Sequence, residues 1–275
     1  MNRIINVFSV GAETPFTLLH FTDVHLTLSD ERDPEEIRTL AETRREKYTH
    51  SLPMLREAAR LSAEGRGLLV NTGDMTDFIS FRNHEVIRRF TEENDCFFVC
   101  GNHDFRPMGG MQYDVPACQA ENLERVQRLY RNDIRFASRV VNGVNLVGMD
   151  DAYYRFEPWE AERLKAEVAR GMPIILFLHV PLFHEDLFRL MVQGRRKHAS
   201  LVAVPESMMT EYPPERYEQQ IADPLTRELA EYIKSEPAIR LVVAGHNHKS
   251  LEMTLADRLP QLVTSVDEIR EIRIR

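Results

Sequence analysis

The sequence predicts an α/β protein with a mixed sheet, or two sheets packed together, and helices outside. Two observations support this fold class. Short apolar runs with the length of buried strands alternate with helical segments and then cluster near the end of the chain. Five of these runs lead directly into Asp, Asn or His residues. Ligands of open α/β sheets gather beyond the carboxyl ends of the strands, so the second observation also places a candidate site.

The apolar run over residues 68–70 is the clearest of the five. It is followed by Thr72 and Gly73, and Asp74 comes directly after them. The other four runs behave in the same way, which predicts five strands whose polar ends share one edge. These runs and the residues that follow them are 16–21 with Asp23 and His25, 96–100 with Asn102, His103 and Asp104, 174–178 with His179, and 241–244 with His246 and His248.

The first long helical pattern begins near Asp33 and Pro34. An Asp at a helix cap accepts a hydrogen bond from a free N–H group, and Pro is tolerated at the first helical position because it has no N–H to leave unpaired. The pattern is expected to break or kink at Pro53 and to continue to Gly65. The pattern therefore predicts a helical segment that precedes the strand at residues 68–70 and covers the sheet.

Turn and cap residues place the later elements. Asn142-Gly143 between two apolar segments predicts a tight hairpin. Gly171 ends one predicted helix, and Asp223 caps another. The remaining predicted elements are the strands 4–10, 139–141, 144–149, 251–255, 262–266 and 271–275 and the helices 80–92, 119–130, 158–170 and 225–234.

The domain organisation is predicted from the absence of boundaries within the sequence. There is no internal repeat, low-complexity tract or linker, so residues 1–275 are expected to form a single domain. Residues 181–222 are polar, contain Met and Pro, and have no clear period apart from a short helix near 187–192. This segment is therefore predicted to be a loop insertion that faces the substrate.

Composition and charge restrict the class of protein. Hydrophobic residues make up 43% and charged residues 28% of the chain, as in soluble globular proteins, and no apolar run has the length of a membrane span. With no cleavable signal pattern, we expect a cytoplasmic protein without a membrane partner. The formal net charge of −8 disfavours a nucleic-acid partner. Cys96, Cys100 and Cys118 form no evident disulfide framework and are interpreted as free core thiols.

The residues at the predicted strand ends have the composition of a metal site. Asp, Asn and His offer oxygen and nitrogen ligands, which suit Mn, Fe, Zn or Ni better than a soft metal or a structural zinc. They are too many for one tetrahedral shell, so two divalent or trivalent ions are expected. Asp74, in the middle of the edge, is the best candidate for a bridging ligand. Such a pair binds phosphate oxygens and makes a bound water acidic enough to give hydroxide near neutral pH.

The ordered set of motifs resembles the calcineurin-like metallophosphoesterases. The motifs span residues 23–248 and are Asp23-Val24-His25, Gly73-Asp74, Gly101-Asn102-His103-Asp104, His179 and Gly245-His246-Asn247-His248. The resemblance implies a four-layer α/β/β/α sandwich of two mixed sheets flanked by helices, and a dinuclear site bridged by Asp74. It implies that one metal is held by Asp23, His25 and His248 and the other by Asn102, His179 and His246.

The same resemblance implies that His103 lies unligated beside the substrate and that Asp104 orients it. His103 is then expected to protonate the leaving group while a metal-bridging hydroxide attacks in line from the opposite side. In the purple acid phosphatases a Tyr ligates iron three residues beyond the bridging Asp. That position is Asp77 here, so an iron–tyrosinate centre is not expected. Asp77 is interpreted as the cap of the following helix.

The predicted activity is hydrolysis of a small-molecule or nucleotide phosphoester, with a phosphodiester as the preferred substrate. A monoester carries a second negative charge and calls for additional cationic groups around the phosphate. Near the motifs, the cationic residues are Arg106 and Lys249, and neither lies within a motif, so a diester is favoured. A monoesterase or protein phosphatase with the same site is the alternative. A non-catalytic scaffold of the same fold is a weaker one, because every ligand position and the His103–Asp104 pair are filled.

Residues outside the motifs have less specific interpretations. His20 is interpreted as structural, and His50, His84 and His198 as surface residues. His184 either lines the site or is a loop residue. Two groups in the 181–222 segment have two interpretations each: 195–197 is either a solvated basic face or a phosphate contact, and Met208, Met209 and Tyr212 either form an apolar lid or pack the loop.

Overall fold

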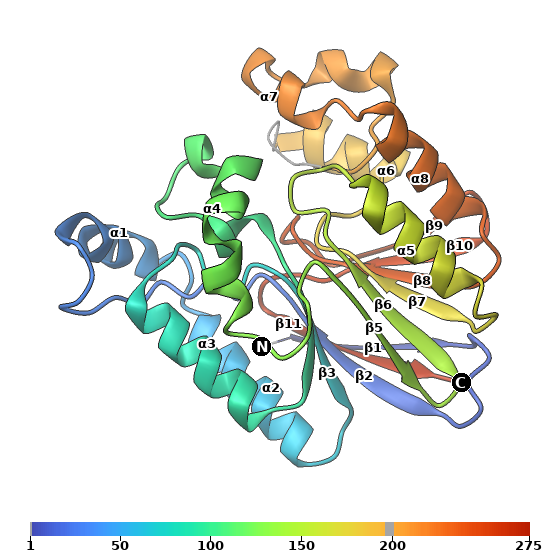
Figure 1. The fold of residues 1–275 in the computed structure, drawn as a ribbon, viewed down its shortest axis with the longest axis horizontal. Coiled ribbons are helices and arrows are strands. Elements are labelled where there is room, and N and C mark those ends of the chain that lie inside the picture. Colours follow the sequence, from blue (N-terminus) through green and yellow to red (C-terminus); the bar gives the residue numbers. More distant parts are fainter. Residues whose placement is uncertain (1, 196–200) are drawn as a thin grey trace.

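The computed structural model describes residues 2–195 and 201–275, so the predictions for Arg196, Lys197 and His198 lie outside the described residues. Two mixed sheets are stacked face to face, and helices cover the outer face of each (Figure 1). The predicted four-layer α/β/β/α sandwich is therefore confirmed.

The first sheet contains the two ends of the described chain. The last strand of the chain, β11, lies second in this sheet, where it pairs in parallel with β1 and antiparallel with β2. The N-terminal strands β1 and β2, which are close in sequence, are thus separated by a strand from the far end of the chain. In spatial order the strands are β1 (Asn2–Phe8), β11 (Glu268–Ile274), β2 (Phe16–Phe21), β3 (Leu68–Thr72) and β4 (Cys96–Val99).

The second sheet begins with the predicted hairpin. Its turn residues Asn142 and Gly143 have φ angles of 46° and 79°, the left-handed values that a tight Asn-Gly turn requires. β6, β7, β8 and β10 then run parallel to one another. In spatial order the strands are β5 (Phe136–Val141), β6 (Val144–Met149), β7 (Ile174–Phe177), β8 (Ile239–Ala244), β10 (Leu259–Val263) and β9 (Leu251–Leu255).

Three apolar layers hold the sandwich together, and neighbouring residues of one strand serve different layers. Leu18 of β2 packs between the two sheets, together with Val70, Phe177 and Val243. Leu19, the next residue, points to the helices on the outer face. Side chains alternate across a strand, so a central strand buried on both faces has a continuous apolar sequence. This explains why the strands were detectable as uninterrupted apolar runs.

Five helices supply the outer layers. The first sheet is covered by α2 (Ser51–Ala63), α3 (Phe81–Glu93) and α4 (Pro116–Gln127), and the second by α5 (Pro158–Val168) and α8 (Pro224–Ser235). The predicted cap of α8 is confirmed, because the Asp223 side chain accepts a hydrogen bond from the backbone N–H of Thr226 at 2.7 Å.

The predicted long first helix is two helices. α1 (Glu35–Arg45) ends well before α2, and Pro53 lies in the first turn of α2 rather than at a kink. A proline is tolerated there because the first N–H groups of a helix have no partner within the helix. The prediction that Asp33 caps α1 is also wrong. Its carboxylate accepts instead from the backbone N–H groups of Asp30 and Phe81, which ties the loop to α3.

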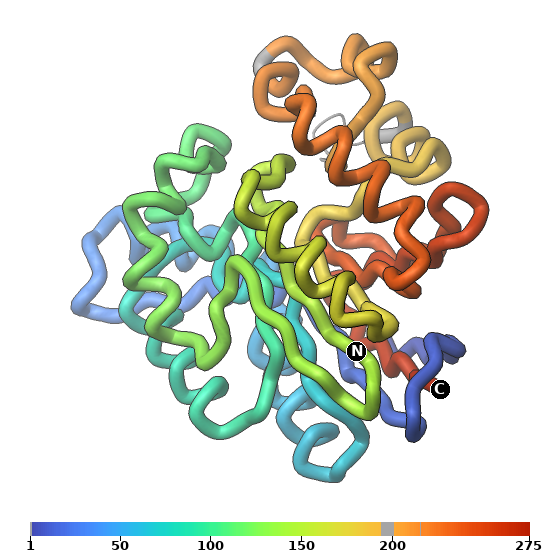
Figure 2. Tube along the Cα trace, turned by 45° about the vertical axis from the view of Figure 1, so that its right-hand side comes forward, coloured from blue at the N-terminus to red at the C-terminus, as the bar shows by residue number. Residues whose placement is uncertain are grey.

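The described parts of the segment 181–222, residues 181–195 and 201–222, project beyond the sheets beside α8 (Figure 2). They contain α6 (Glu185–Phe188), a π-helical stretch (Arg189–Arg195), a 3₁₀ helix (Glu206–Glu211) and α7 (Pro214–Gln220), which was not predicted. Phe188, Met209 and Tyr212 belong to a separate apolar cluster of this segment. Met209 and Tyr212 therefore pack the segment, in agreement with the second of the two interpretations.

Two predictions from composition can be compared with the described residues. Cys96, Cys100 and Cys118 are buried free thiols, as expected. No helix in the described part of the chain combines the length and the apolar character needed to cross a membrane.

Candidate dinuclear metal site

The candidate ligands lie in turns that follow β2, β3, β4, β7 and β8, where the ends of the two sheets meet. Several of these turns contain left-handed, non-glycine backbone, with φ angles of 52° at Asp23, 55° at Asp74 and 65° at His246. Each such residue costs roughly 1–3 kcal/mol and persists where its surroundings determine it. His25 and His248 have the same kind of conformation, with φ angles of 49° and 52°.

Backbone hydrogen bonds and a glycine determine these conformations. The N–H groups of Asp23 and His25 donate to the carbonyl groups of Gly73 and Asp74, at 3.0 and 2.8 Å, so the turns after β2 and β3 are joined. A Cβ atom on Gly101 would collide with the Asp74 carboxylate. A glycine at this position therefore lets the turn after β4 approach the other two.

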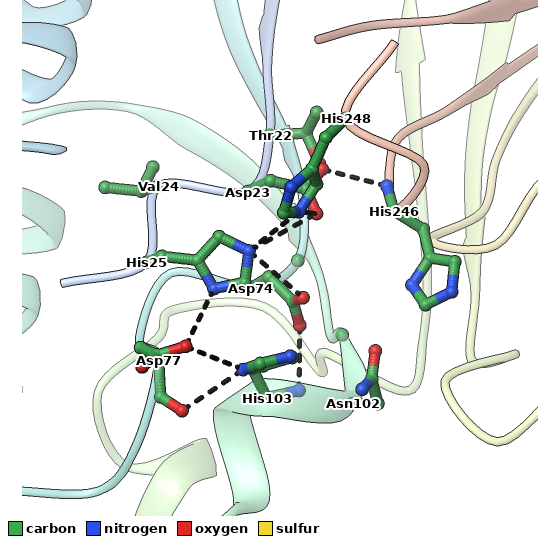
Figure 3. A network of polar contacts seen from close by, with 12 residues as sticks. Thr22, Asp23, Val24, His25, Asp74, Asp77, Asn102, His103, His246 and His248 are labelled. Atoms are coloured by element: carbon green, nitrogen blue, oxygen red, sulfur yellow. Dashed lines mark hydrogen bonds and ion pairs between the residues drawn. The ribbon is translucent and has the colours of Figure 1, made fainter. Parts of the chain in front are cut away.

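Asp23, His25 and His248 form the first of two clusters. His248 Nε2 lies 3.2 Å from Asp23 Oδ1 and 3.0 Å from His25 Nε2. Asp23 Oδ1 is buried and has no hydrogen-bond partner among the described residues. A buried carboxylate oxygen without a donor is costly, and a cation between these three side chains would relieve that cost. Figure 3 shows the three side chains directed toward one another.

The second cluster contains Asp74, His179 and His246. His179 Nε2 lies 3.5 Å from Asp74 Oδ2 and 3.1 Å from His246 Nδ1. Asn102 belongs to the same group, because its Oδ1 is 3.1 Å from His179 Nε2. Within each cluster, one donor atom from each acidic or His residue lies within 4.8 Å of the others, close enough to surround one ion.

Asp74 lies between the two clusters. Its Oδ2 is 3.7 Å from His25 Nε2 and 3.5 Å from His179 Nε2, so one carboxylate oxygen faces both sides. Its Oδ1 accepts the backbone N–H of His103 at 2.8 Å, which fixes the carboxylate in this orientation (Figure 3). The donor set, the unpartnered Asp23 oxygen and this central carboxylate all fit a pair of metal ions.

The electrostatics of the clusters also favour cation binding. Burial alone would raise the pKa of the Asp74 carboxyl, but His179 and the other nearby His side chains hold it below its usual range. Burial lowers the pKa of His246 to about 3, so this ring is neutral and able to act as a ligand. His179 is the exception, because Asp74 outweighs burial and raises its pKa to about 10.

The carboxylate beside the His103 ring is Asp77, not Asp104. His103 Nδ1 lies 3.1 Å from Asp77 Oδ1, and Arg44 holds both carboxylate oxygens of Asp77 at 2.6 and 2.7 Å. Burial would raise the pKa of the Asp77 carboxyl, but hydrogen bonds from His103 and Arg44 keep it low. The interpretation of Asp77 as a helix cap is wrong as well, because α3 is capped by Ser80.

Asp104 supports the backbone of the site. Its carboxylate accepts the N–H groups of Gly101, Asp74 and Thr76 at 2.9, 3.0 and 3.2 Å. The expectation that Asp104 orients His103 is therefore wrong. The Asp104 side chain points away from the His103 ring and joins the turns after β3 and β4. The carboxylate that contacts the ring is Asp77, in the turn after β3. Burial raises the pKa of Asp104 to about 7.

His103 also belongs to a third potential ligand group, with His25 and Asp74. Its ring lies against His25 with a centroid distance of 4.6 Å. The geometry thus allows a second role for His103, as a ligand, beside the predicted unligated one. The contact of Nδ1 with Asp77 is compatible with both roles, because it leaves Nε2 available to a metal ion or to a leaving group.

A cavity of about 490 Å³ lies over the clusters. His103 and Arg106 line it, whereas His184 caps α6 and lies outside it. Several lining residues had no signal in the sequence, because they come from helices and turns with no motif: Arg44, Lys47, Tyr48, Asp114, Tyr154, Met191 and Arg216.

Asp114 is the most connected of these undetected residues. Its Oδ1 accepts from Asn102 Nδ2 at 2.9 Å, and this bond orients the Asn102 amide so that Oδ1 faces the second cluster. Its Oδ2 accepts from Tyr154 Oη at 3.0 Å and lies 3.0 Å from Arg106. Burial would raise the pKa of the Asp114 carboxyl, but the Arg106 charge holds it low.

Some remaining histidines differ from the expectation. His20 is buried between the hydroxyl groups of Thr72 and Thr264, as expected for a structural residue. His50, expected at the surface, is half-buried and its ring lies 3.2 Å from the Asp23 carbonyl oxygen. It therefore supports the turn that carries two candidate ligands.

The model of the calcineurin-like phosphoesterase family matches residues 16–250, which include every candidate ligand. This fold and two clusters of His and Asp define a metal-dependent phosphoester hydrolase. The chain belongs to the calcineurin-like phosphoesterase family. No match was found among curated protein sequences.

One solved structure supports the fold. A dimetal phosphatase from Danio rerio is similar with a TM-score of 0.50 and 14% identity, over 91% of this chain and 87% of that chain. A putative 5′-nucleotidase from Staphylococcus aureus has a TM-score of 0.46 and 13% identity, over 92% of this chain and 49% of that chain.

Proposed function

We propose that the protein hydrolyses phosphodiesters at a dinuclear centre, with Asp23, His25 and His248 around one ion, Asn102, His179 and His246 around the other, and Asp74 between them. The donor set suits Mn, Fe, Zn or Ni. When bound, two such ions supply positive charge to a phosphate group and make a water molecule more acidic. The three free thiols are compatible with the expected cytoplasmic location.

The observation that carries the diester preference is the pairing of the arginines in the cavity. Arg44 is held by Asp77, and Arg106 and Arg216 share Asp114 at 3.0 and 3.5 Å. The carboxylates of Asp77 and Asp114 thus offset two of the positive charges outside the two clusters. A diester carries one negative charge at the reacting phosphate and needs less compensation than a monoester, which carries nearly two.

His103 is the proposed general acid. It lines the cavity, and the contact with Asp77 fixes its Nδ1. Its Nε2 is then available to the oxygen of the leaving group, and Asp77 stabilises the protonated ring. Asp104 is proposed to act through the backbone of Asp74 and Gly101 rather than on the substrate.

A monoesterase is the second candidate. Arg106 and Arg216 are two cations for the single charge of Asp114, so one positive charge is left over in the cavity. That charge would suit the second negative charge of a monoester. Lys47 lines the same cavity.

The two candidates are separated by a pair of substrates. Metal-loaded protein is assayed on bis-(p-nitrophenyl) phosphate and p-nitrophenyl phosphate with the same metal, and we expect the higher kcat/KM on the diester. Asp74→Ala, prepared in parallel, controls for a contaminating phosphatase. A higher kcat/KM on the monoester would reject the diesterase in favour of the second candidate.

A further inference from the structure

We propose that Arg106 and Arg216 bind a second anionic group of the substrate, a carboxylate or a phosphate, on the ester arm that faces α7. This inference rests on the proposed function and specifies its substrate class. The ester would be a phosphodiester in which one arm carries a negative charge of its own.

The two guanidinium groups form a built site. They come from segments far apart in the chain, Arg106 from the turn after β4 and Arg216 from α7, and they meet at Asp114. Both line the cavity over the metal clusters, and their residues are only 8% and 7% exposed. Burying a guanidinium group costs free energy unless an anion compensates its charge. Two buried guanidinium groups beside each other therefore indicate an anion-binding role.

The hydrogen bonds of the pair are incomplete. The buried Nε atoms of Arg106 and Arg216 have no acceptor among the residues that the structure describes. Asp114 Oδ2 serves both arginines while also accepting from Tyr154, and Asp114 Oδ1 is taken by Asn102. One carboxylate therefore faces two guanidinium groups and has little capacity to accept further hydrogen bonds. A planar anion with two oxygens in the cavity would accept hydrogen bonds from the Nη groups of the pair and neutralise the remaining charge.

The pair adjoins the site of reaction, because Arg106 Nη1 lies 3.3 Å from His103 Nδ1. Asp114 lies between the arginines and Asn102, so the pair adjoins the second cluster without being part of either. The cavity of about 490 Å³ has room for an ester arm that extends from the clusters toward α7. The reacting phosphate and the second anion would then be recognised by different groups.

Matched substrates test the proposal. Propyl p-nitrophenyl phosphate and 2-carboxyethyl p-nitrophenyl phosphate share a leaving group and differ by one carboxylate. A 2-phosphoethyl analogue tests phosphate as the anion, and a 2-(trimethylammonio)ethyl analogue reverses the charge. We expect the carboxylate or the phosphate analogue to exceed the propyl ester in kcat/KM by ~10–100-fold, the usual value of a charge-assisted hydrogen bond.

Variants assign the preference to the arginines. Arg216→Gln and Arg106→Gln should lose the preference for the anionic arm, mainly through KM, while metal analysis still finds two ions. Arg216→Lys should recover part of it, because it keeps the charge but not the planar fork. Arg189→Gln is the matched control, since Arg189 belongs to the same segment but is 61% exposed and paired with Glu185.

Each contrary outcome is distinct. Equal or faster turnover of the propyl ester by the unaltered protein, or an anionic preference that survives in both Gln variants, would overturn the second anion site and leave the phosphodiesterase intact. Preference for the cationic arm would also overturn it, and would direct attention to the neighbouring acidic cavity of about 600 Å³ that Asp150 and Glu157 line. Absence of hydrolysis of every diester would instead reject the proposed function.

Discussion

The rim of the metal clusters and the wall of the cavity are built in different ways. The rim consists of turns at the ends of buried strands, and Asp23, Asp74 and His179 there are fully or almost fully buried. Its positions are determined by the backbone, through hydrogen bonds between turns and left-handed residues. The wall is formed by side chains such as Arg106 and Arg216, which are positioned by ion pairs.

This difference predicts different consequences of mutation. A sheet edge tolerates little change, because moving one turn moves several candidate ligands, whereas an ion pair in the wall is one contact among several. We therefore expect substitutions in the rim to remove metal and activity together. Substitutions in the wall should change substrate preference, or the affinity for one ion, while the chemistry remains.

The largest effect is expected for Asp74→Ala in the rim. Its carboxylate lies between the clusters, so its loss should remove at least one ion and nearly all activity. Metal analysis and a diester assay on the purified variant measure both. Two tightly held ions in this variant would contradict the bridging role. Asp74 would then resemble the residues of the wall, whose substitution leaves the ions bound.

His103→Ala is expected to be the next largest change. If His103 donates a proton, kcat should fall by ~10²–10⁴-fold on an alkyl or nucleoside ester and much less on a p-nitrophenyl ester, whose leaving group needs little protonation. Both ions should remain. Asp77→Asn should reproduce part of this pattern, because Asp77 rather than Asp104 contacts the ring.

The result for His103 also tests the alternative ligand role. Loss of metal from His103→Ala would identify it as a ligand, consistent with its grouping with His25 and Asp74. An equal fall in kcat on both esters would show that it positions substrate instead of donating a proton.

Asp114→Asn should have an intermediate effect, because Asp114 connects the wall to the rim. It orients Asn102, and removing such a supporting carboxylate typically weakens metal binding by ~10–100-fold. We expect the loss at the second cluster, while the ion at Asp23, His25 and His248 stays. Calorimetric titration with metal measures the two sites separately. Asp95→Asn, an exposed residue paired with Arg139, is the control and should change neither affinity.

The smallest effect per step is expected for pH, because one pH unit changes the affinity for metal by about tenfold at most. The pKa of His179, raised to about 10 by Asp74 against the effect of burial, means that this ring is protonated in the metal-free protein at neutral pH. Metal must displace that proton, so the apparent affinity should rise with pH, by up to about tenfold per unit, and level off near pH 10. Calorimetry in buffers of different ionisation enthalpy should find about one proton released per ion at the second cluster.

The same shift has a consequence for stability with the opposite sign. Because the folded-state pKa of His179 lies above the ordinary value of 6.5, its charge stabilises the metal-free fold fully below pH 6.5. That contribution is lost as the pH rises toward 10. Metal affinity and metal-free stability should therefore change in opposite directions over this range. Thermal unfolding with a chelator present tests this, and a melting temperature that rises between pH 7 and 9 would contradict it.

The sequence by itself determined the strands, the hairpin at Asn142-Gly143 and the residues that gather at the strand ends. These features depend on short stretches of chain: an apolar run buried on both faces, a turn that needs left-handed residues, and a ligand placed directly after a strand. The correct edge follows from them, because parallel strands end on the same side of a sheet.

Only the tertiary structure decided which side chains pair across the site. Sequence adjacency favoured Asp104 as the partner of His103, but Asp104 points into the turn and Asp77 takes that place, held by Arg44 from α1. The wall required Arg216 of α7 to meet Asp114, more than a hundred residues earlier. Such contacts depend on how helices and loops pack around the sheets, and neither periodicity nor a motif specifies them.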